Sequence, residues 1–69
     1  MFDSALLEYE MKKRKISKGD MCSALKISRS AFYRKCNGIS EFTQSEMQTI
    51  EDMLGQDAVI RIFFGEKVS

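Results

Sequence analysis

The chain has 69 residues, of which 43% are apolar and 30% are charged. This length allows one small domain, residues 1–69, and the composition supports a packed core rather than disorder. The absence of histidine excludes the commonest general base and the commonest metal ligand. No apolar run is long enough to span a membrane and no signal peptide is visible, so we expect a cytoplasmic protein without a membrane partner.

The charge is distributed unevenly along the chain. Residues 1–38 contain nine basic and four acidic residues, a net charge of +5, whereas residues 39–69 contain two basic and six acidic residues, a net charge of −4. This asymmetry is typical of a protein that binds a polyanion through one side, although a solvated face without a partner explains the charge equally well. The basic run at 12–15 is better explained as a helix end that complements the helix dipole.

Caps and apolar spacing predict the first two helices. The first covers about 4–14 and is opened by Asp3. Its predicted apolar stripe consists of Phe2, Ala5, Leu6 and Tyr9. The second covers 18–25, where Ser17 and Asp20 have the spacing of a weak capping box. Its predicted buried residues are Met21, Cys22 and Leu25.

Three further helices are predicted. Ser28 caps a helix over 29–37, which Gly38 ends. Thr43 and Glu46 form a full capping box for a helix over 44–54. The last segment, 58–64, alternates like a strand but also fits a helix turn, and we favour a helix capped by Asp57.

The turn between the second and third helices carries the functional prediction. Only a few residues separate Leu25 from the cap Ser28, so the two helices cross steeply, as in a helix-turn-helix. With Phe32 and Cys36 facing inward, the third helix exposes Arg29, Ser30, Tyr33, Arg34 and Asn37. Guanidinium groups match the acceptor pair on a guanine edge, and helix starts at Ser17 and Ser28 attract phosphates.

Residues 17–38 resemble the helix-turn-helix of the lambda-repressor/Cro family, also called the XRE family. The matching positions are Ser17, Met21, Cys22, Leu25, Ile27, Ser28, Phe32, Asn37 and Gly38. With the flanking helices, the resemblance covers about residues 4–55. Three lysines depart from the family pattern: Lys18 replaces a glutamine, Lys26 the glycine of the turn, and Lys35 an apolar residue. We expect Lys26 to adopt the left-handed conformation.

The resemblance implies an all-α domain, a compact bundle of four to five helices that binds DNA. It implies a regulator of transcription, a phage or mobile-element repressor of Cro/CI type, which binds a palindromic double-stranded operator as a homodimer. The implied base-reading residues are Arg29, Ser30, Arg34 and Tyr33. The implied DNA-backbone contacts are Ser17, Lys18, Ser28, Asn37, Gly38 and Ser40. Repressor and activator are not distinguished.

A second hypothesis is a protein-interaction module, antitoxin-like or an adaptor, that keeps the fold and contacts a protein through its acidic half and Phe63/Phe64. Ion pairs between Arg29 or Arg34 and Glu41, Glu46 or other acidic residues would favour this alternative. We expect no enzyme, because no nucleophile and base are coupled, and no small-molecule substrate or cofactor. Two cysteines without histidine make no zinc site, so Cys22 and Cys36 are predicted to be small buried hydrophobic residues.

Overall fold

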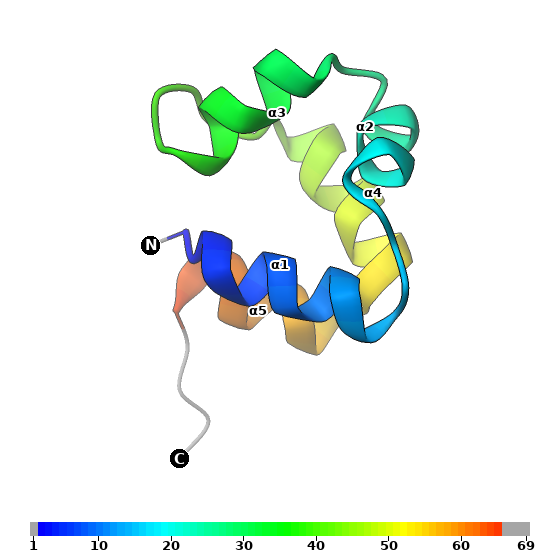
Figure 1. Ribbon diagram of the computed structural model, residues 1–69. Helices are drawn as coiled ribbons and strands as arrows, with labels where there is room; N and C mark the ends of the chain where they lie inside the picture. Colours follow the sequence, from blue (N-terminus) through cyan, green and yellow to red (C-terminus); the bar gives the residue numbers. More distant parts are fainter. Residues whose placement is uncertain (1, 66–69) are drawn as a thin grey trace.

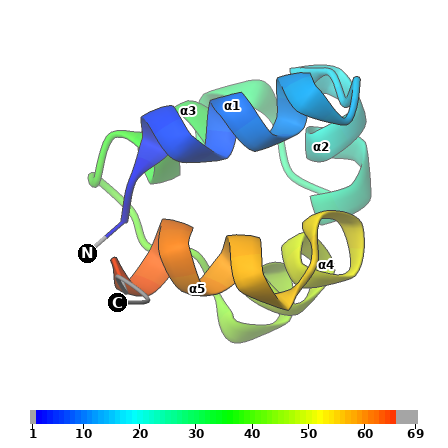
Figure 2. The same ribbon diagram turned by 90° about the horizontal axis from the view of Figure 1, so that it is seen from below.

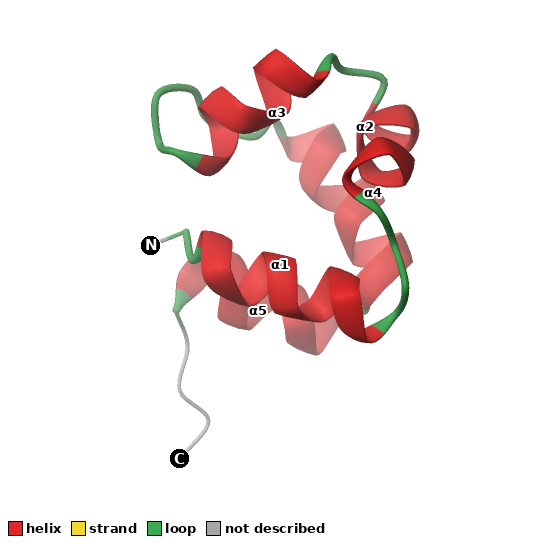
Figure 3. Ribbon diagram, viewed as in Figure 1, coloured by secondary structure: helices red, strands yellow, loops and turns green. Residues whose placement is uncertain are grey.

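The computed structural model describes residues 2–65, which form five helices and no strand (Figures 1 and 3). The helices are α1 (Ser4–Lys13), α2 (Lys18–Leu25), α3 (Arg29–Cys36), α4 (Gln44–Leu54) and α5 (Gln56–Phe64). The predicted all-α bundle is therefore confirmed. Residue 1 and residues 66–69 of the predicted domain lie outside the described part.

Local side-chain caps fix four of the helix starts. The Asp3 carboxylate accepts a hydrogen bond from the Leu6 backbone amide at 3.0 Å. The Ser28 hydroxyl accepts one from the amide of Ala31 at 3.1 Å. α2 and α4 both begin with reciprocal capping boxes, in which the side chain of the third helical residue also accepts from the cap amide. The predicted caps of α1 to α4 are all confirmed.

The start of α5 differs from the prediction. The helix begins at Gln56, with Gly55 as its cap and no side-chain capping bond, so Asp57 lies in the first turn instead of capping. There its negative charge still complements the helix dipole. The strand alternative for this segment is wrong, because Ala58, Val59 and Ile62 form one buried helical face.

The buried face of α1 also differs from the prediction. Leu7, Glu10 and Met11 are buried, whereas Tyr9 is 58% exposed. The apolar pattern missed this face because a carboxylate occupies its middle. Glu10 forms ion pairs with Lys13 and Arg14 on its own helix, and with Arg61 of α5 at 3.7 Å. These partners offset the cost of burying the charge.

All five helices contribute side chains to one apolar core. In the view of Figure 2, α4 leads directly into α5; α5 packs against α1, and α4 packs against α2. α3 packs chiefly on α2, at the margin of the molecule. The apolar core residues are Leu7, Met11, Met21, Cys22, Leu25, Phe32, Ile50, Leu54, Ala58, Val59 and Ile62. None of the described helices is long and apolar enough to cross a membrane.

An aromatic cluster joins the beginning of the chain to the loop before α4. The ring of Phe2 lies 5.2 Å from those of Phe42 and Phe63, and Phe42 also contacts Phe32 of α3, at 6.4 Å. Phe63 therefore packs on the core, whereas Phe64 is 59% exposed. The two adjacent phenylalanines therefore face different surroundings.

Candidate nucleic-acid interface

The connection between α2 and α3 has the predicted tight geometry. Lys26 ends α2 in the left-handed conformation (φ 60°, ψ 42°), and its successor Ile27 donates a backbone hydrogen bond to the Cys22 carbonyl at 3.1 Å. Ile27 also packs against the core, which anchors the turn. α3 consequently runs across the end of α2 instead of returning alongside it (Figure 1). This arrangement leaves one side of α3 open to solvent.

The solvent-facing side of α3 carries the side chains that were predicted to be exposed. Arg29, Ser30, Tyr33, Arg34 and Asn37 are all exposed. Tyr33 is 66% exposed, so most of its surface faces solvent. The Asn37 amide donates to the backbone carbonyl of Tyr33 at 2.7 Å, which caps the end of the helix.

Arg29 and Arg34 carry charges that are not neutralised within the described part of the chain. No acidic side chain between residues 2 and 65 forms an ion pair with either guanidinium. The carboxylate of Glu46 is paired with Lys35 instead. The ion pairs that would favour the protein-interaction alternative are therefore absent from the described part of the chain.

The exposed residues of α3 divide into two flanks. Arg29, Tyr33 and Asn37 border a groove of about 500 Å³ between α3 and α1. Its other wall includes Ser4 and Glu8 of α1. Ser30 and Arg34 are not part of this groove and lie farther round the helix. The concave region therefore borders one flank of α3 only.

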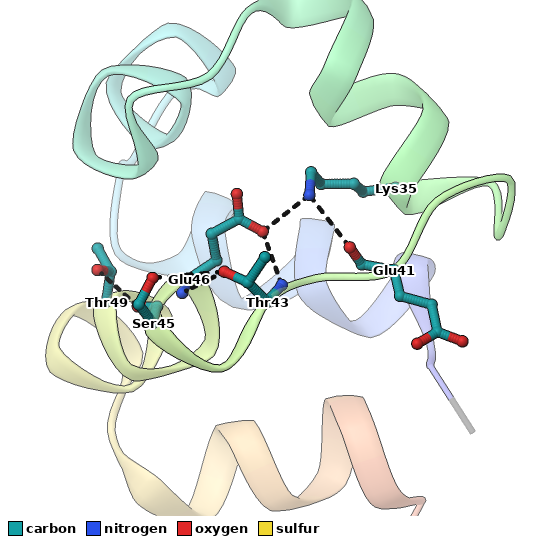
Figure 4. Close-up of polar contacts among 6 residues, drawn as sticks. All are labelled: Lys35, Glu41, Thr43, Ser45, Glu46 and Thr49. Atoms are coloured by element: carbon teal, nitrogen blue, oxygen red, sulfur yellow. Dashed lines mark hydrogen bonds and ion pairs between the residues drawn. The ribbon is translucent and has the colours of Figure 1, made fainter.

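Lys35 determines how α3 is rotated about its own axis, and this role was not predicted from the sequence. Its ammonium group donates to Glu46 Oε1 at 2.9 Å and to the backbone carbonyl of Glu41 at 3.1 Å (Figure 4). It also lies 5.8 Å from the centre of the Phe42 ring. The position that is apolar in the family pattern is therefore filled by a paired lysine, whose four-carbon stem covers apolar surface.

One carboxylate oxygen connects α3 to the start of α4. Glu46 Oε1 accepts the Lys35 ammonium and, at 2.8 Å, the backbone amide of Thr43. Burial raises the pKa of Glu46, but the hydrogen bonds from Lys35 and Thr43 outweigh it and hold the pKa below its ordinary value. The sequence pattern identified the capping box of Thr43 and Glu46. It gave no signal that Lys35 also binds this carboxylate, because Lys35 is eleven residues away from Glu46.

The predicted backbone-contacting residues lie at helix ends. Ser17 and Ser28 use their hydroxyl oxygens as caps, which leaves each hydroxyl proton free to donate. Lys18 pairs with Glu8 at 3.4 Å, but both side chains are 62% exposed, so this pair is weak. Ser40 is half-buried. Gly38 has the predicted positive φ, 80°.

The basic run at the end of α1 has a structural use. Lys13 and Arg14 both contact the buried carboxylate of Glu10, and Lys15 adopts a left-handed conformation (φ 58°) after the helix. Two of these four charges therefore stabilise the fold, in line with the interpretation that the run is a helix end.

The two cysteines lie in the apolar core or against it. Cys22 is buried, Cys36 is half-buried, and both are free thiols. Burial raises the pKa of the Cys36 thiol, although the nearby Lys18 acts to lower it. A thiol with a raised pKa is a poor nucleophile at neutral pH. Among residues 2–65, no cluster of three or more cysteine or acidic side chains is placed to hold a metal ion.

Neither a protein-family model, nor a curated protein, nor a solved structure matches the chain.

Proposed function

We propose that the protein is a sequence-specific DNA-binding regulator that inserts α3 into the major groove. One observation carries the proposal: Arg29 and Arg34 lie exposed on a helix at the margin of the fold and pair with no acid of residues 2–65. Two unpaired guanidinium groups on one short helix have no evident role in the stability of the fold. A guanidinium can bind the O6 and N7 acceptors of guanine in a bidentate manner.

The surrounding residues supply the rest of the interface. Ser30 and Tyr33 lie beside the arginines, where a hydroxyl and an aromatic ring can contact base edges and a thymine methyl. Ser17, Lys18 and Ser28 lie at the starts of the two crossing helices and contact phosphates, as do Asn37, Gly38 and Ser40 beyond α3. Lys18 exchanges its weak pair with Glu8 for a phosphate.

The operator is palindromic in this proposal, and a homodimer binds it. Two copies of α3 then meet successive major grooves about one helical turn apart, which is roughly 34 Å in B-form DNA. The resemblance to the lambda-repressor/Cro family supports a compact cytoplasmic repressor of phage or mobile-element type that acts without a cofactor or a small-molecule substrate. Regulation then depends on protein concentration or on a partner.

A protein-interaction module is the second candidate, and the exposure of Phe64 and Ile39 favours it. These side chains are 59% and 69% exposed. A dimer interface explains an exposed Phe64 equally well. The unpaired arginines fit DNA better than they fit an interaction through the acidic half of the chain.

Selection from a pool of random duplexes with the purified protein tests the proposal. The protein should enrich a palindromic consensus, and Arg29→Ala should lose the preference for that consensus while keeping most binding to other duplexes. Lys12→Ala is the matched control, because it removes one positive charge from the exposed surface of α1. An equal loss of affinity for all duplexes in Arg29→Ala, or no enrichment by the unaltered protein, would contradict the proposal.

A further inference from the structure

We propose that Gly19 is a positioning residue for Arg29, and that it thereby determines which base sequence the protein prefers. Gly19 lies in the first turn of α2, and Arg29 is the first residue of α3. The inference rests on the proposed function. It adds a residue that does not itself contact DNA.

The space above Gly19 is occupied by the Arg29 guanidinium. A Cβ atom built on Gly19 would lie 3.1 Å from Arg29 Nη2 and 3.7 Å from Ser17 Oγ. The first distance is closer than an ordinary van der Waals contact, so the guanidinium lies where the side chain of any other residue at position 19 would begin. The missing side chain therefore allows the arginine to lie across the start of α2.

The backbone gives no other reason for a glycine at this position. Gly38, Gly55 and Gly65 are the glycines of residues 2–65 with positive φ, and Gly19 is not among them. In a helical conformation glycine is less favourable than alanine. The glycine thus weakens α2 without relieving a strained turn, and the close approach of Arg29 accounts for it.

The position of the Arg29 guanidinium is determined by the open space above Gly19, and not by an ion pair with an acid of residues 2–65. The acid in the same turn of α2, Asp20, has its carboxylate hydrogen-bonded to the amide of Ser17 at 3.2 Å. The partial positive charge at the start of α2 also gives the guanidinium no attraction. Because no acid of residues 2–65 pairs with Arg29, added atoms at position 19 redirect its side chain.

We expect the displacement of the Arg29 guanidinium to increase with the size of the side chain at position 19. A methyl group requires the flexible guanidinium to move by only a few tenths of an ångström. A leucine fills the space completely and turns Arg29 away from the first turn of α2. Both residues favour a helix more than glycine does, so neither change should unfold α2.

The experiment compares Gly19→Ala and Gly19→Leu with a matched control, Ala24→Leu. The control adds a leucine to an exposed position of α2 near the other end of the helix. For each protein, the affinity is measured for the duplex that the unaltered protein selects and for a scrambled duplex. NMR of the free proteins checks the fold and the contact between the Gly19 Hα protons and the Arg29 side chain.

We expect Gly19→Leu to lower the preference for the selected duplex about ten-fold, which is the size of one lost bidentate base contact, with scrambled-duplex affinity unchanged. Gly19→Ala should lie between this variant and the unaltered protein, and Ala24→Leu should match the unaltered protein. Full preference in a folded Gly19→Leu protein would overturn the role of Gly19 and leave the proposed function standing. If the unaltered protein prefers no sequence, the proposed function fails together with this role.

Discussion

The carboxylate of Glu46 both accepts the Thr43 amide at the start of α4 and pairs with Lys35 of α3, and replacing Glu46 with glutamine separates these two roles. Glutamine can still accept the Thr43 amide, because it occupies this position of a capping box almost as well as glutamate. It cannot neutralise the ammonium group of Lys35, which donates to Glu46 at 2.9 Å. Glu46→Gln therefore keeps the start of α4 and weakens the link between α4 and α3.

The magnitude follows from the burial of the pair. Both side chains are 12% exposed, so solvent screens the interaction only partly. A hydrogen bond to a charged group contributes about 1.5–3 kcal/mol, and we expect Glu46→Gln to lower the free energy of unfolding by about 2 kcal/mol. For a domain of this size, that loss lowers the melting temperature by roughly 10 °C.

A double-mutant cycle with Lys35→Met measures the coupling directly. Unfolding in urea is followed for the unaltered protein, Glu46→Gln, Lys35→Met and the double variant. Because Lys35→Met removes the ammonium group that Glu46→Gln leaves unpaired, the double variant should be more stable than the sum of the single losses predicts, by about 1–2 kcal/mol. Additive losses, or a loss below about 0.5 kcal/mol in Glu46→Gln, would refute this account of how α3 is held.

The pH dependence of the same pair has a definite sign. The pKa of folded Glu46 is lower than its ordinary value of 4.5, because the hydrogen bonds from Lys35 and Thr43 outweigh the effect of burial. The stabilisation is therefore complete above the ordinary pKa and is lost as the pH falls through the lowered pKa. The stability difference between the unaltered protein and Glu46→Gln should shrink accordingly below about pH 4.5. A difference that stays constant from pH 7 to pH 3 would contradict the charged pair.

Three other substitutions test separate parts of the fold. Thr43→Ala removes the α4 cap and should lower stability by about 1 kcal/mol in thermal unfolding; an unchanged melting curve would contradict this helix start. Lys26→Gly relieves the left-handed conformation of the turn and should raise stability by roughly 1 kcal/mol in urea, whereas a loss would show that the lysine contributes more than its backbone costs. Phe64→Ala should shift a monomer–dimer equilibrium toward monomer in analytical ultracentrifugation, and an unchanged equilibrium would place the dimer contact elsewhere.

Local chemistry explains why most helix boundaries could be predicted. The caps at Asp3, Ser17, Ser28 and Thr43 each accept a hydrogen bond from the amide three residues ahead, so their signal is contained in a few consecutive letters. The start of α5 lacks such a signal, because Gly55 supplies no capping side chain. The prediction accordingly placed that start at the next polar residue able to cap, Asp57.

Charged residues that act in the interior account for the other differences. Glu10 lies on the buried face of α1, where Lys13 and Arg14 of its own helix and Arg61, fifty-one residues later, all pair with its carboxylate. Lys35 turns toward α4 because Glu46 receives it. Hydrophobic patterning treats such residues as solvent-exposed, so it missed both the face of α1 and the residue that fixes α3. The exposure of Arg29 and Arg34 was predictable, since the apolar residues of α3 already define its inner side, but their contact with DNA remains a prediction.

The backbone bond between Asp3 and Ile62, 2.7 Å from amide nitrogen to carbonyl oxygen, has a practical consequence for labelling the protein. It fastens the start of α1 beside α5, so the first and last described residues, Phe2 and Gly65, lie at a common edge. This edge adjoins the carboxyl end of α3, whereas Arg29 and Ser30 lie at its amino end (Figure 1). A fluorophore attached at this edge therefore lies away from the two residues that begin α3, and it can serve in tests of the proposed DNA binding.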